Sequence, residues 1–128
     1  MPMPEAPADR AAREPVRHRR IVLFNPNTNA QATELMLDSA RRSLPLFASI
    51  EGHTAPRGVP LITDEAALDA AAPVVVEFGL GLRDAGFDAL VIAAFGDPGL
   101  AILRAKMGIP VAGIAEAGIH EAGDGGRA

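Results

Sequence analysis

Apolar and polar residues follow two alternating patterns along the chain. Four short apolar runs, rich in Val, Ile and Leu, are typical of β-strands: residues 20–24, 46–54, 87–94 and 109–114. Four other segments repeat their apolar positions every three or four residues, which predicts helices: residues 29–44, 64–84, 98–107 and 115–122. This regular alternation predicts an α/β fold, a parallel four-stranded sheet with helices on both faces.

Within the predicted sheet, the pattern separates a central strand from an edge strand. Residues 87–94 are apolar on both faces, as expected of a parallel strand with neighbours on each side. Residues 46–54 alternate only weakly between apolar and polar side chains, which predicts a strand at the edge.

The ends of the first two helices are marked by capping and breaking residues. Thr28 or Asn29 can cap the first helix, because a short side-chain oxygen accepts a backbone N–H that lacks a partner inside the helix. Pro45 ends that helix. Thr63 or Asp64 can cap the second helix in the same way.

Proline and glycine shape the later helices. Pro73 predicts either a kink in the 64–84 helix or its division into two, because proline lacks the N–H that a helix interior requires. Asp97 followed by Pro98 predicts the start of the third helix, with Asp97 as its N-cap. Gly108 predicts the end of that helix.

The net charge of −4 is unevenly distributed over the 128 residues. Residues 1–20 contain five Arg and three acidic residues, whereas residues 21–128 contain seven basic and thirteen acidic ones. An acidic body without a basic stripe argues against nucleic acid as a partner. No apolar run approaches the ~20 residues that span a membrane, so we expect no membrane partner either.

Composition along the chain also predicts the domain boundaries. Residues 1–19 lack the apolar core of a secretory signal and predict a disordered tail. Residues 20–122 form one α/β domain, and residues 123–128 form a glycine-rich end, which we interpret as a truncation point.

The residue types that usually bind metals or cofactors are scarce. The chain has no cysteine, which excludes disulfides, cysteine-based zinc sites and thiol catalysis within it. Its three His are far apart and form no pattern of metal ligands: His18, His53 and His120. No P-loop and no dinucleotide-binding glycine pattern follows the first strand. We therefore expect no metal and no cofactor.

Ligands of such a sheet bind beyond the carboxyl ends of the strands, which directs attention to the loops at 25–28, 94–99 and 115–117. The first loop, NPNT, opens a helix, where free N–H groups favour an anion. The same residue types are also favoured in ordinary turns, so a plain turn with a helix cap remains an alternative.

The second loop, AFGDPG, combines small residues that let the backbone approach a ligand. In this loop the N–H groups of Phe95 and Gly96 are candidates to point into the site. Asp97 is more simply explained as a helix cap. Glu116, in the third loop, is more simply explained as a first-turn residue that favours the helix dipole.

Three phrases together resemble one known family: IVLFNPNTNAQAT at 21–33, GFDALVIAAFGDPGL at 86–100 and IPVAGIAEAGIHEA at 109–122. They are similar to the N-terminal half of the hydantoin racemases, a branch of the aspartate/glutamate racemase superfamily. The resemblance implies a cofactor-independent isomerase built from two similar α/β domains, with its active site in the cleft between them.

In the family that the chain resembles, one cysteine from each domain flanks the substrate α-carbon. One thiolate removes the proton and the other thiol returns a proton on the opposite face. By resemblance, the substrate-binding positions of this chain lie in two loops: Asn25, Pro26, Asn27, Thr28, Ala94, Phe95 and Gly96. Ala94 stands where the first cysteine is expected, and the second belongs to a domain that the chain lacks. We therefore expect the chain alone to be inactive.

The resemblance also implies a small-molecule partner, namely a carboxylate, an amino acid or a hydantoin, together with a cytoplasmic location and a homo-oligomer. Two alternatives remain. One is an enzyme similar to arylmalonate decarboxylase, which works with a single thiol in the second domain. The other is a non-catalytic domain that binds small carboxylates or dimerises.

Overall fold

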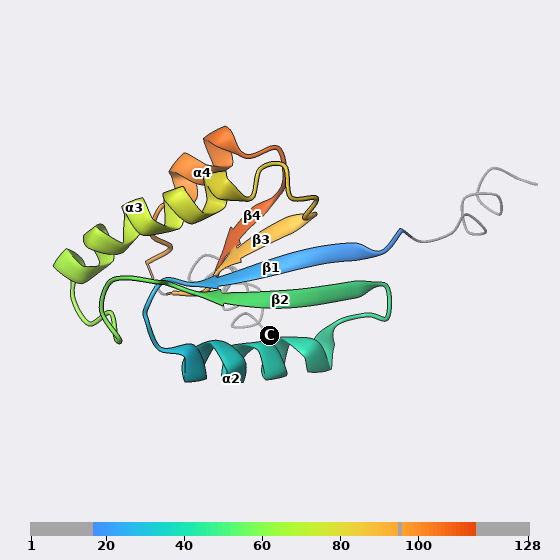
Figure 1. Ribbon diagram of the computed structural model, residues 1–128, viewed down its shortest axis with the longest axis horizontal. Helices are drawn as coiled ribbons and strands as arrows, with labels where there is room; N and C mark the ends of the chain where they lie inside the picture. The colour runs from blue at the N-terminus through green and yellow to red at the C-terminus, as the bar shows by residue number, and fades with distance from the viewer. Residues whose placement is uncertain (1–16, 95, 115–128) are drawn as a thin grey trace, which may run out of the picture.

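The computed structural model describes residues 17–94 and 96–114 (Figure 1). The elements of this part of the chain are β1 (Arg19–Asn25), α2 (Ala30–Ser43), β2 (Ala48–Thr54), α3 (Glu65–Gly81), β3 (Ala89–Ile92), α4 (Leu100–Lys106) and β4 (Val111–Gly113). The strands pair in parallel, in the order β2-β1-β3-β4. The predicted α/β fold with a parallel four-stranded sheet is confirmed. The predicted helix at 115–122 lies outside the described residues.

Helices cover both faces of the sheet, as predicted. Figure 1 shows α2 on one face and α3 beside α4 on the other. The alternation of side chains along β1 explains this arrangement, since successive residues of a strand point to opposite faces. Val22 and Phe24 belong to the core beneath α3 and α4, whereas Leu23 belongs to the core beneath α2.

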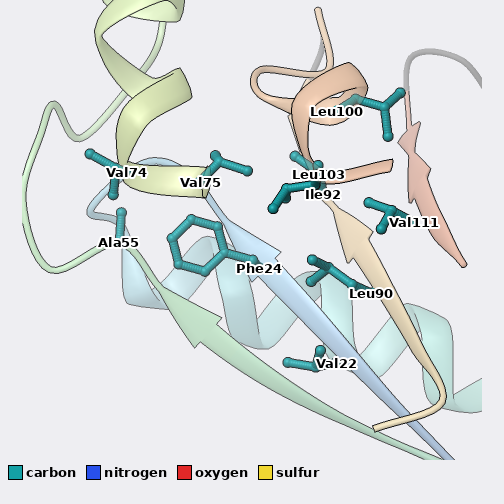
Figure 2. Close-up of a cluster of buried hydrophobic side chains, with 10 residues drawn as sticks. All are labelled: Val22, Phe24, Ala55, Val74, Val75, Leu90, Ile92, Leu100, Leu103 and Val111. Atoms are coloured by element: carbon teal, nitrogen blue, oxygen red, sulfur yellow. The ribbon is translucent and has the colours of Figure 1, made fainter. Parts of the chain in front are cut away.

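The larger core lies between the sheet and the two helices α3 and α4, and Figure 2 shows its ten buried side chains. Phe24 stacks on Phe78 of α3, with the ring centroids 4.1 Å apart. Burial of a side chain of this size contributes roughly 1.5–3 kcal/mol. The smaller core joins α2 to the other face through four buried residues: Leu23, Leu37, Ile50 and Ala93.

The strands occupy the predicted positions, but β3 and β4 are shorter than the apolar runs that predict them. Within the described sheet β2 lies at one edge and β3 lies between β1 and β4. The 87–94 run extends beyond β3 because apolar residues mark buried positions, whereas the limits of β3 are set by hydrogen bonds to the neighbouring strands. Phe87 packs against the larger core and Ala93 is buried in the smaller one, although neither belongs to β3.

The structure selects one residue from each pair of predicted helix caps. Asn29 caps α2, with its side-chain oxygen accepting the Ala32 N–H at 3.2 Å. Asp64 caps α3 by accepting the Ala67 N–H at 2.7 Å. Pro45 follows the end of α2 as predicted.

The prediction that Pro73 divides its helix is wrong, because α3 runs unbroken from Glu65 to Gly81. Proline removes the hydrogen bond to the carbonyl four residues earlier, which belongs to Asp69. Both residues are exposed, so that carbonyl lies on the solvent side of the helix. Water can replace the missing donor there, and the helix continues.

The predicted boundaries of the third helix are also wrong. α4 begins at Leu100, and its N-cap is Gly99, in a left-handed conformation with φ of 76° and no side-chain cap. Asp97 lies in the preceding turn, where its carbonyl accepts the Leu100 N–H at 3.2 Å. At the other end Met107 takes the cap position in an extended conformation, so Gly108 is not the cap. Chain reversal before α4, rather than side-chain capping, decides where the helix starts.

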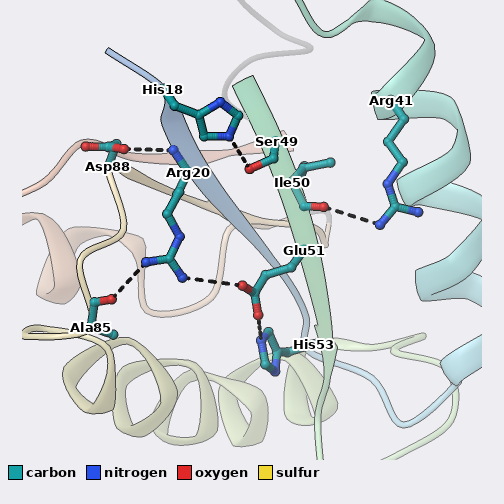
Figure 3. Close-up of polar contacts among 9 residues, drawn as sticks. All are labelled: His18, Arg20, Arg41, Ser49, Ile50, Glu51, His53, Ala85 and Asp88. Carbon is teal, nitrogen blue, oxygen red and sulfur yellow. Dashed lines mark hydrogen bonds and ion pairs between the residues drawn. The ribbon is translucent and has the colours of Figure 1, made fainter. Parts of the chain in front are cut away.

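The residues just before the predicted start of the domain at residue 20 make contacts with the sheet. Arg19 is the first residue of β1, and His18 is hydrogen-bonded through Nε2 to Ser49 Oγ at 2.9 Å (Figure 3). The Arg17 guanidinium pairs with the carboxylate of Asp88. Residues 17–19 therefore belong to the fold, because side chains of β2 and of the segment before β3 bind them.

Asp88 holds the start of β1 against the segment that leads into β3. Its carboxylate accepts the Arg20 N–H at 2.7 Å and also pairs with Arg17. The hydrogen bond from the Arg20 backbone, followed by the one from the Arg17 guanidinium, lowers the pKa of Asp88 below its usual value. The Arg20 guanidinium lies over the ring of Phe87, 4.4 Å from its centroid, and strengthens the same junction.

We predict that Asp88→Asn lowers the free energy of unfolding at neutral pH. A carboxyl group whose pKa is lower in the folded state stabilises the fold above its unfolded pKa of about 3.9, and this contribution disappears as pH falls through the folded value. Urea unfolding from pH 7 to pH 3 should therefore show a difference between the two proteins that shrinks towards acid. Asp84→Asn is the matched control, because Asp84 is exposed in the same loop. A difference that stays constant with pH would contradict the assignment.

Candidate functional site

The two loops predicted to bind substrate follow neighbouring strands and leave the sheet at the same edge. Phe24 near the end of β1 pairs with Ile92 at the end of β3, and the Ala93 N–H donates to Phe24 O at 2.9 Å. Ile92 also pairs with Gly113, the last residue of β4. The turns after β1 and β3 therefore begin side by side, and β4 ends next to them.

This edge includes the point at which the strand order reverses. From β1 the chain passes to β2 on one side of the sheet, and then to β3 on the other side of β1. The connecting helices α2 and α3 lie on opposite faces (Figure 1). In open parallel sheets, helices that diverge in this way leave a crevice outside the carboxyl ends of the strands, where ligands bind. The turns after β1 and β3 flank that position.

Asn25, at the end of β1, is completely buried, and its side-chain amide is engaged inside the protein. Its Oδ1 accepts the Asn27 N–H at 3.1 Å. Its Nδ2 donates to Asn29 O at 3.1 Å and to Thr33 Oγ1 at 3.0 Å. The backbone carbonyl of Asn25 accepts the Ala55 N–H at 2.9 Å. One residue thus holds together the end of β1, the start of α2 and the segment after β2.

Two further contacts complete the arrangement of the first turn. Thr33 is buried, and its hydroxyl lies 2.6 Å from that of Thr54 at the end of β2. The Thr28 N–H donates to the carbonyl of Val59 at 2.9 Å, which attaches the loop after β2 to the turn. The interpretation of NPNT as a turn with a helix cap agrees with this geometry. If this turn contributes to a substrate site, Asn25 acts there by holding the turn in position.

Pro26 is buried and forms one wall of a small cleft of about 50 Å³. The loop after β2 and the first half of α3 form the other walls, with Val59 and Ala71 among their residues. Arg57 also borders the cleft, and its guanidinium donates to Glu77 at 2.6 Å, which lowers the pKa of the Glu77 carboxyl.

The second loop turns sharply after Ala94. Ala94 is half-buried, and its carbonyl accepts the Asp97 N–H at 3.3 Å. Gly96 has a φ of 89°, and a Cβ at this position would overlap the side chain of Leu68 in α3. The small residues of the loop are therefore required by packing against α3 and by left-handed backbone geometry. Phe95 lies outside the described residues, as does the predicted third loop at 115–117.

Asp97 has a position that sequence reasoning missed. Its backbone is left-handed, with φ of 46°, a conformation that Asp adopts more readily than most residues. Its carboxylate lies directly over Gly113 at the end of β4, where a Cβ would overlap it. A carboxylate thus stands between the ends of β3 and β4. The signal for this was the Gly-Asp-Pro-Gly sequence, which favours a turn of consecutive unusual conformations over a helix cap.

A further group of polar side chains forms a partly exposed cluster on β1 and β2, and its His53 pairs in register with Phe24 near the carboxyl end of β1. His53 Nε2 lies 2.9 Å from Glu51 Oε2, and Arg20 lies 3.8 Å from the same carboxylate (Figure 3). No group of three His, Cys, Asp or Glu residues in the described part of the chain could hold a metal ion. Among those same residues, no helix has the length and apolar character needed to cross a membrane.

The fold is that of open parallel α/β domains, a class in which ligands bind at the reversal of strand order. Comparison with known proteins places the chain within that class. Residues 21–128 match the family model described as Asp/Glu/Hydantoin racemase, and the chain belongs to this family. The resemblance noted in the sequence is thereby confirmed.

Individual relatives agree with this assignment. The hydantoin racemase of Paenarthrobacter aurescens is 36% identical over 104 residues, which cover 79% of this chain and 43% of that protein. The hydantoin racemase of Pseudomonas sp. (strain NS671) is 34% identical over 104 residues, with 79% and 41% covered. The chain therefore spans less than half the length of these relatives.

Solved structures give the same result. The allantoin racemase from Klebsiella pneumoniae superposes with a TM-score of 0.77 at 39% identity, over 81% of this chain and 42% of that one. The allantoin racemase from Pseudomonas fluorescens superposes with a TM-score of 0.71 at 31% identity, over 77% and 41%. The chain has the fold of these proteins over most of its own length.

We predict that Asn25→Ala destabilises the protein by roughly 2–4 kcal/mol, because a completely buried side chain loses three hydrogen bonds, and the Asn27 N–H loses its acceptor. Asn27→Ala is the matched control. Asn27 is half-buried, and its side chain is seen to make one such bond, to the Asn29 N–H at 2.9 Å, so we expect a loss of about 1 kcal/mol. Urea unfolding of the two variants measures the difference. Equal losses would contradict the assignment of Asn25 as the residue that holds the turn.

Proposed function

We propose that this chain is the substrate-binding half of a cofactor-independent racemase, which inverts a stereocentre α to a carbonyl in hydantoins or amino acids. Membership of the Asp/Glu/Hydantoin racemase family supports the reaction type. The observation that carries the proposal is the position of the NPNT turn and the Ala94 loop. They flank the reversal of strand order, and the sequence resemblance assigns substrate to these two loops.

The proposed substrates are small molecules with an acidic C–H next to a carbonyl. The relatives are named for hydantoin and for allantoin, both of which contain a five-membered ring with such a carbon. Five-substituted hydantoins and allantoin are therefore the first substrates to test, followed by aspartate and glutamate. We also propose a cytoplasmic location and self-association of the chain.

The proposed chemistry needs a group that removes the α-proton and a group that returns a proton on the opposite face. The methyl group of Ala94 can do neither, and the chain has no cysteine elsewhere. We therefore propose that the chain by itself binds substrate but does not racemise it. The network around Asn25 and the turn before α4 would hold the two loops in place while the reacting groups come from elsewhere.

The alanine at position 94 also supports a second candidate, an enzyme that protonates its substrate with one thiol outside this chain. The corresponding non-catalytic candidate is a domain that only binds small carboxylates. Exchange of the α-proton of a hydantoin, after a thiol is placed at position 94, separates the first candidate from these two. Only the first candidate places a hydantoin at the Ala94 loop.

We predict that Ala94→Cys gives the chain a measurable activity in exchange of the α-proton. A thiolate at this position removes the proton from C5 of a 5-substituted hydantoin, and a deuteron from D2O replaces it on the same carbon. One base is sufficient for exchange, although inversion needs a group on each face. Loss of the C5–H signal, followed by proton NMR in D2O, measures the rate. The unsubstituted chain should show only the rate of the buffer.

Ala85→Cys is the matched control for the added thiol. Ala85 is exposed and lies before the start of β3, whereas Ala94 follows the end of β3. The two positions are therefore at opposite ends of the strand. The control should exchange at the buffer rate. If both variants exchange equally fast, or neither exceeds the buffer, the placement of substrate at the Ala94 loop is wrong.

A further inference from the structure

β2 is an edge strand of the described sheet, because no described strand lies beyond it. Only alternate residues of β2 bond to β1. At one end of the pair the Arg19 N–H donates to Phe47 O at 2.8 Å, and at the other the Ala55 N–H donates to Asn25 O at 2.9 Å. The odd-numbered residues of β2 therefore bond to β1. The backbone N–H and C=O groups of the other residues point away from the sheet: Ala48, Ile50, Gly52 and Thr54.

The beginning of this edge has the features of an aggregation-prone strand. Outward-facing backbone groups offer hydrogen bonds to a strand of another molecule. Residues 46–50 (LFASI) contain no charge and no proline, and short apolar segments of this kind pair readily with one another. Leu46 is fully exposed and Phe47 is 45% exposed. A folded protein with such an edge needs a feature that keeps other strands away.

Arg41, in the last turn of α2, reaches this edge (Figure 3). Its guanidinium donates to Ile50 O at 3.3 Å, and Ile50 O is one of the outward-facing acceptors. The Ala48 N–H is already bonded to Pro45 O at 3.1 Å. Arg41 also lines the hollow beside this edge, together with Leu46. A strand that added here would have to displace the guanidinium and remove its charge from water, which is unfavourable.

We propose that Arg41 protects the free edge of β2, by keeping the strands of other chains from adding to it while the protein is folded. The partner that it excludes is an extended strand, which would bind through main-chain hydrogen bonds to Ile50, Gly52 and Thr54. The proposal is independent of the racemase activity, because the end of α2 and the start of β2 lie at the opposite end of the sheet from the strand-end crevice.

Aggregation of the 128-residue chain under conditions where it is folded tests the proposal. Arg41→Met keeps an unbranched side chain but removes the charge and the bond to Ile50. We expect thioflavin T fluorescence to rise roughly tenfold faster than in the unsubstituted chain, because the edge is then open. Arg41→Lys keeps a charge and a donor at the edge, and it should aggregate at close to the rate of the unsubstituted chain.

Arg42→Met is the matched control. It makes the same change in side chain and net charge in the same turn of α2, but Arg42 is exposed and its side chain binds no described residue. This control should aggregate at the rate of the unsubstituted chain. Circular dichroism verifies that each variant is folded, and Arg41→Gln takes the place of Arg41→Met if the latter unfolds. Equal rates for the variants at positions 41 and 42 would overturn the proposal.

A second pair of variants separates protection of the edge from stability of the fold. Adding Leu46→Lys to Arg41→Met returns a positive charge to the hollow beside the edge without restoring the bond to Ile50. We expect aggregation to return to near the original rate. Adding Leu35→Lys instead makes the same exchange at another exposed leucine, on α2 outside the hollow, and aggregation should stay fast. If Leu46→Lys does not suppress aggregation, or Leu35→Lys suppresses it equally, the proposal is wrong.

Discussion

The buried side-chain amide of Asn25 forms the interactions on which the carboxyl edge of the sheet depends. A polar group without access to water must find partners inside the protein, and this amide finds them in the turn after β1 and in α2. Its backbone carbonyl binds the segment after β2 as well. Any shift of that turn would leave buried donors and acceptors unpaired. The direction in which α2 leaves β1 therefore depends on this one buried side chain together with the caps of the turn.

The opposite side of the crevice is shaped by the absence of side chains. Gly96 allows the loop after β3 to lie against Leu68, and Gly113 leaves room for the Asp97 carboxylate at the end of β4. Close packing of backbone against helix and strand replaces the hydrogen-bonded network of the first turn. The result is a pair of turns, at the ends of β1 and β3, without a reactive side chain at Ala94. Proton transfer at an α-carbon requires an acid–base group, which the methyl group of Ala94 does not supply.

Much of the fold and part of the candidate site could be predicted from the chain itself. The apolar runs, the edge position of 46–54 and the pairing of the two loops at one edge follow from periodicity and from the geometry of parallel sheets. The roles of single residues were harder. Asp97 is a residue type that commonly caps helices. Its left-handed backbone instead places its carboxylate over Gly113, where contacts with β4 outweigh the preference of Asp for a cap position. Pro73 failed to divide α3 because its helix face is exposed to water.

The sequence by itself determined the class of fold, the order of its elements, the family and the absence of a thiol, because periodicity and residue identity are local properties of the chain. Only the tertiary structure decided which polar groups face inward and which remain on the surface. Asn25 lies in a turn whose sequence predicts a ligand site. Contacts with α2 and with the segment after β2 instead place its amide inside the protein. Pro73, Val76 and Leu80 have the spacing of one side of an ordinary helix, and they line a groove because Ile102 of α4 lies beside α3. Burial and exposure depend on contacts between residues distant in sequence, and local pattern does not record them.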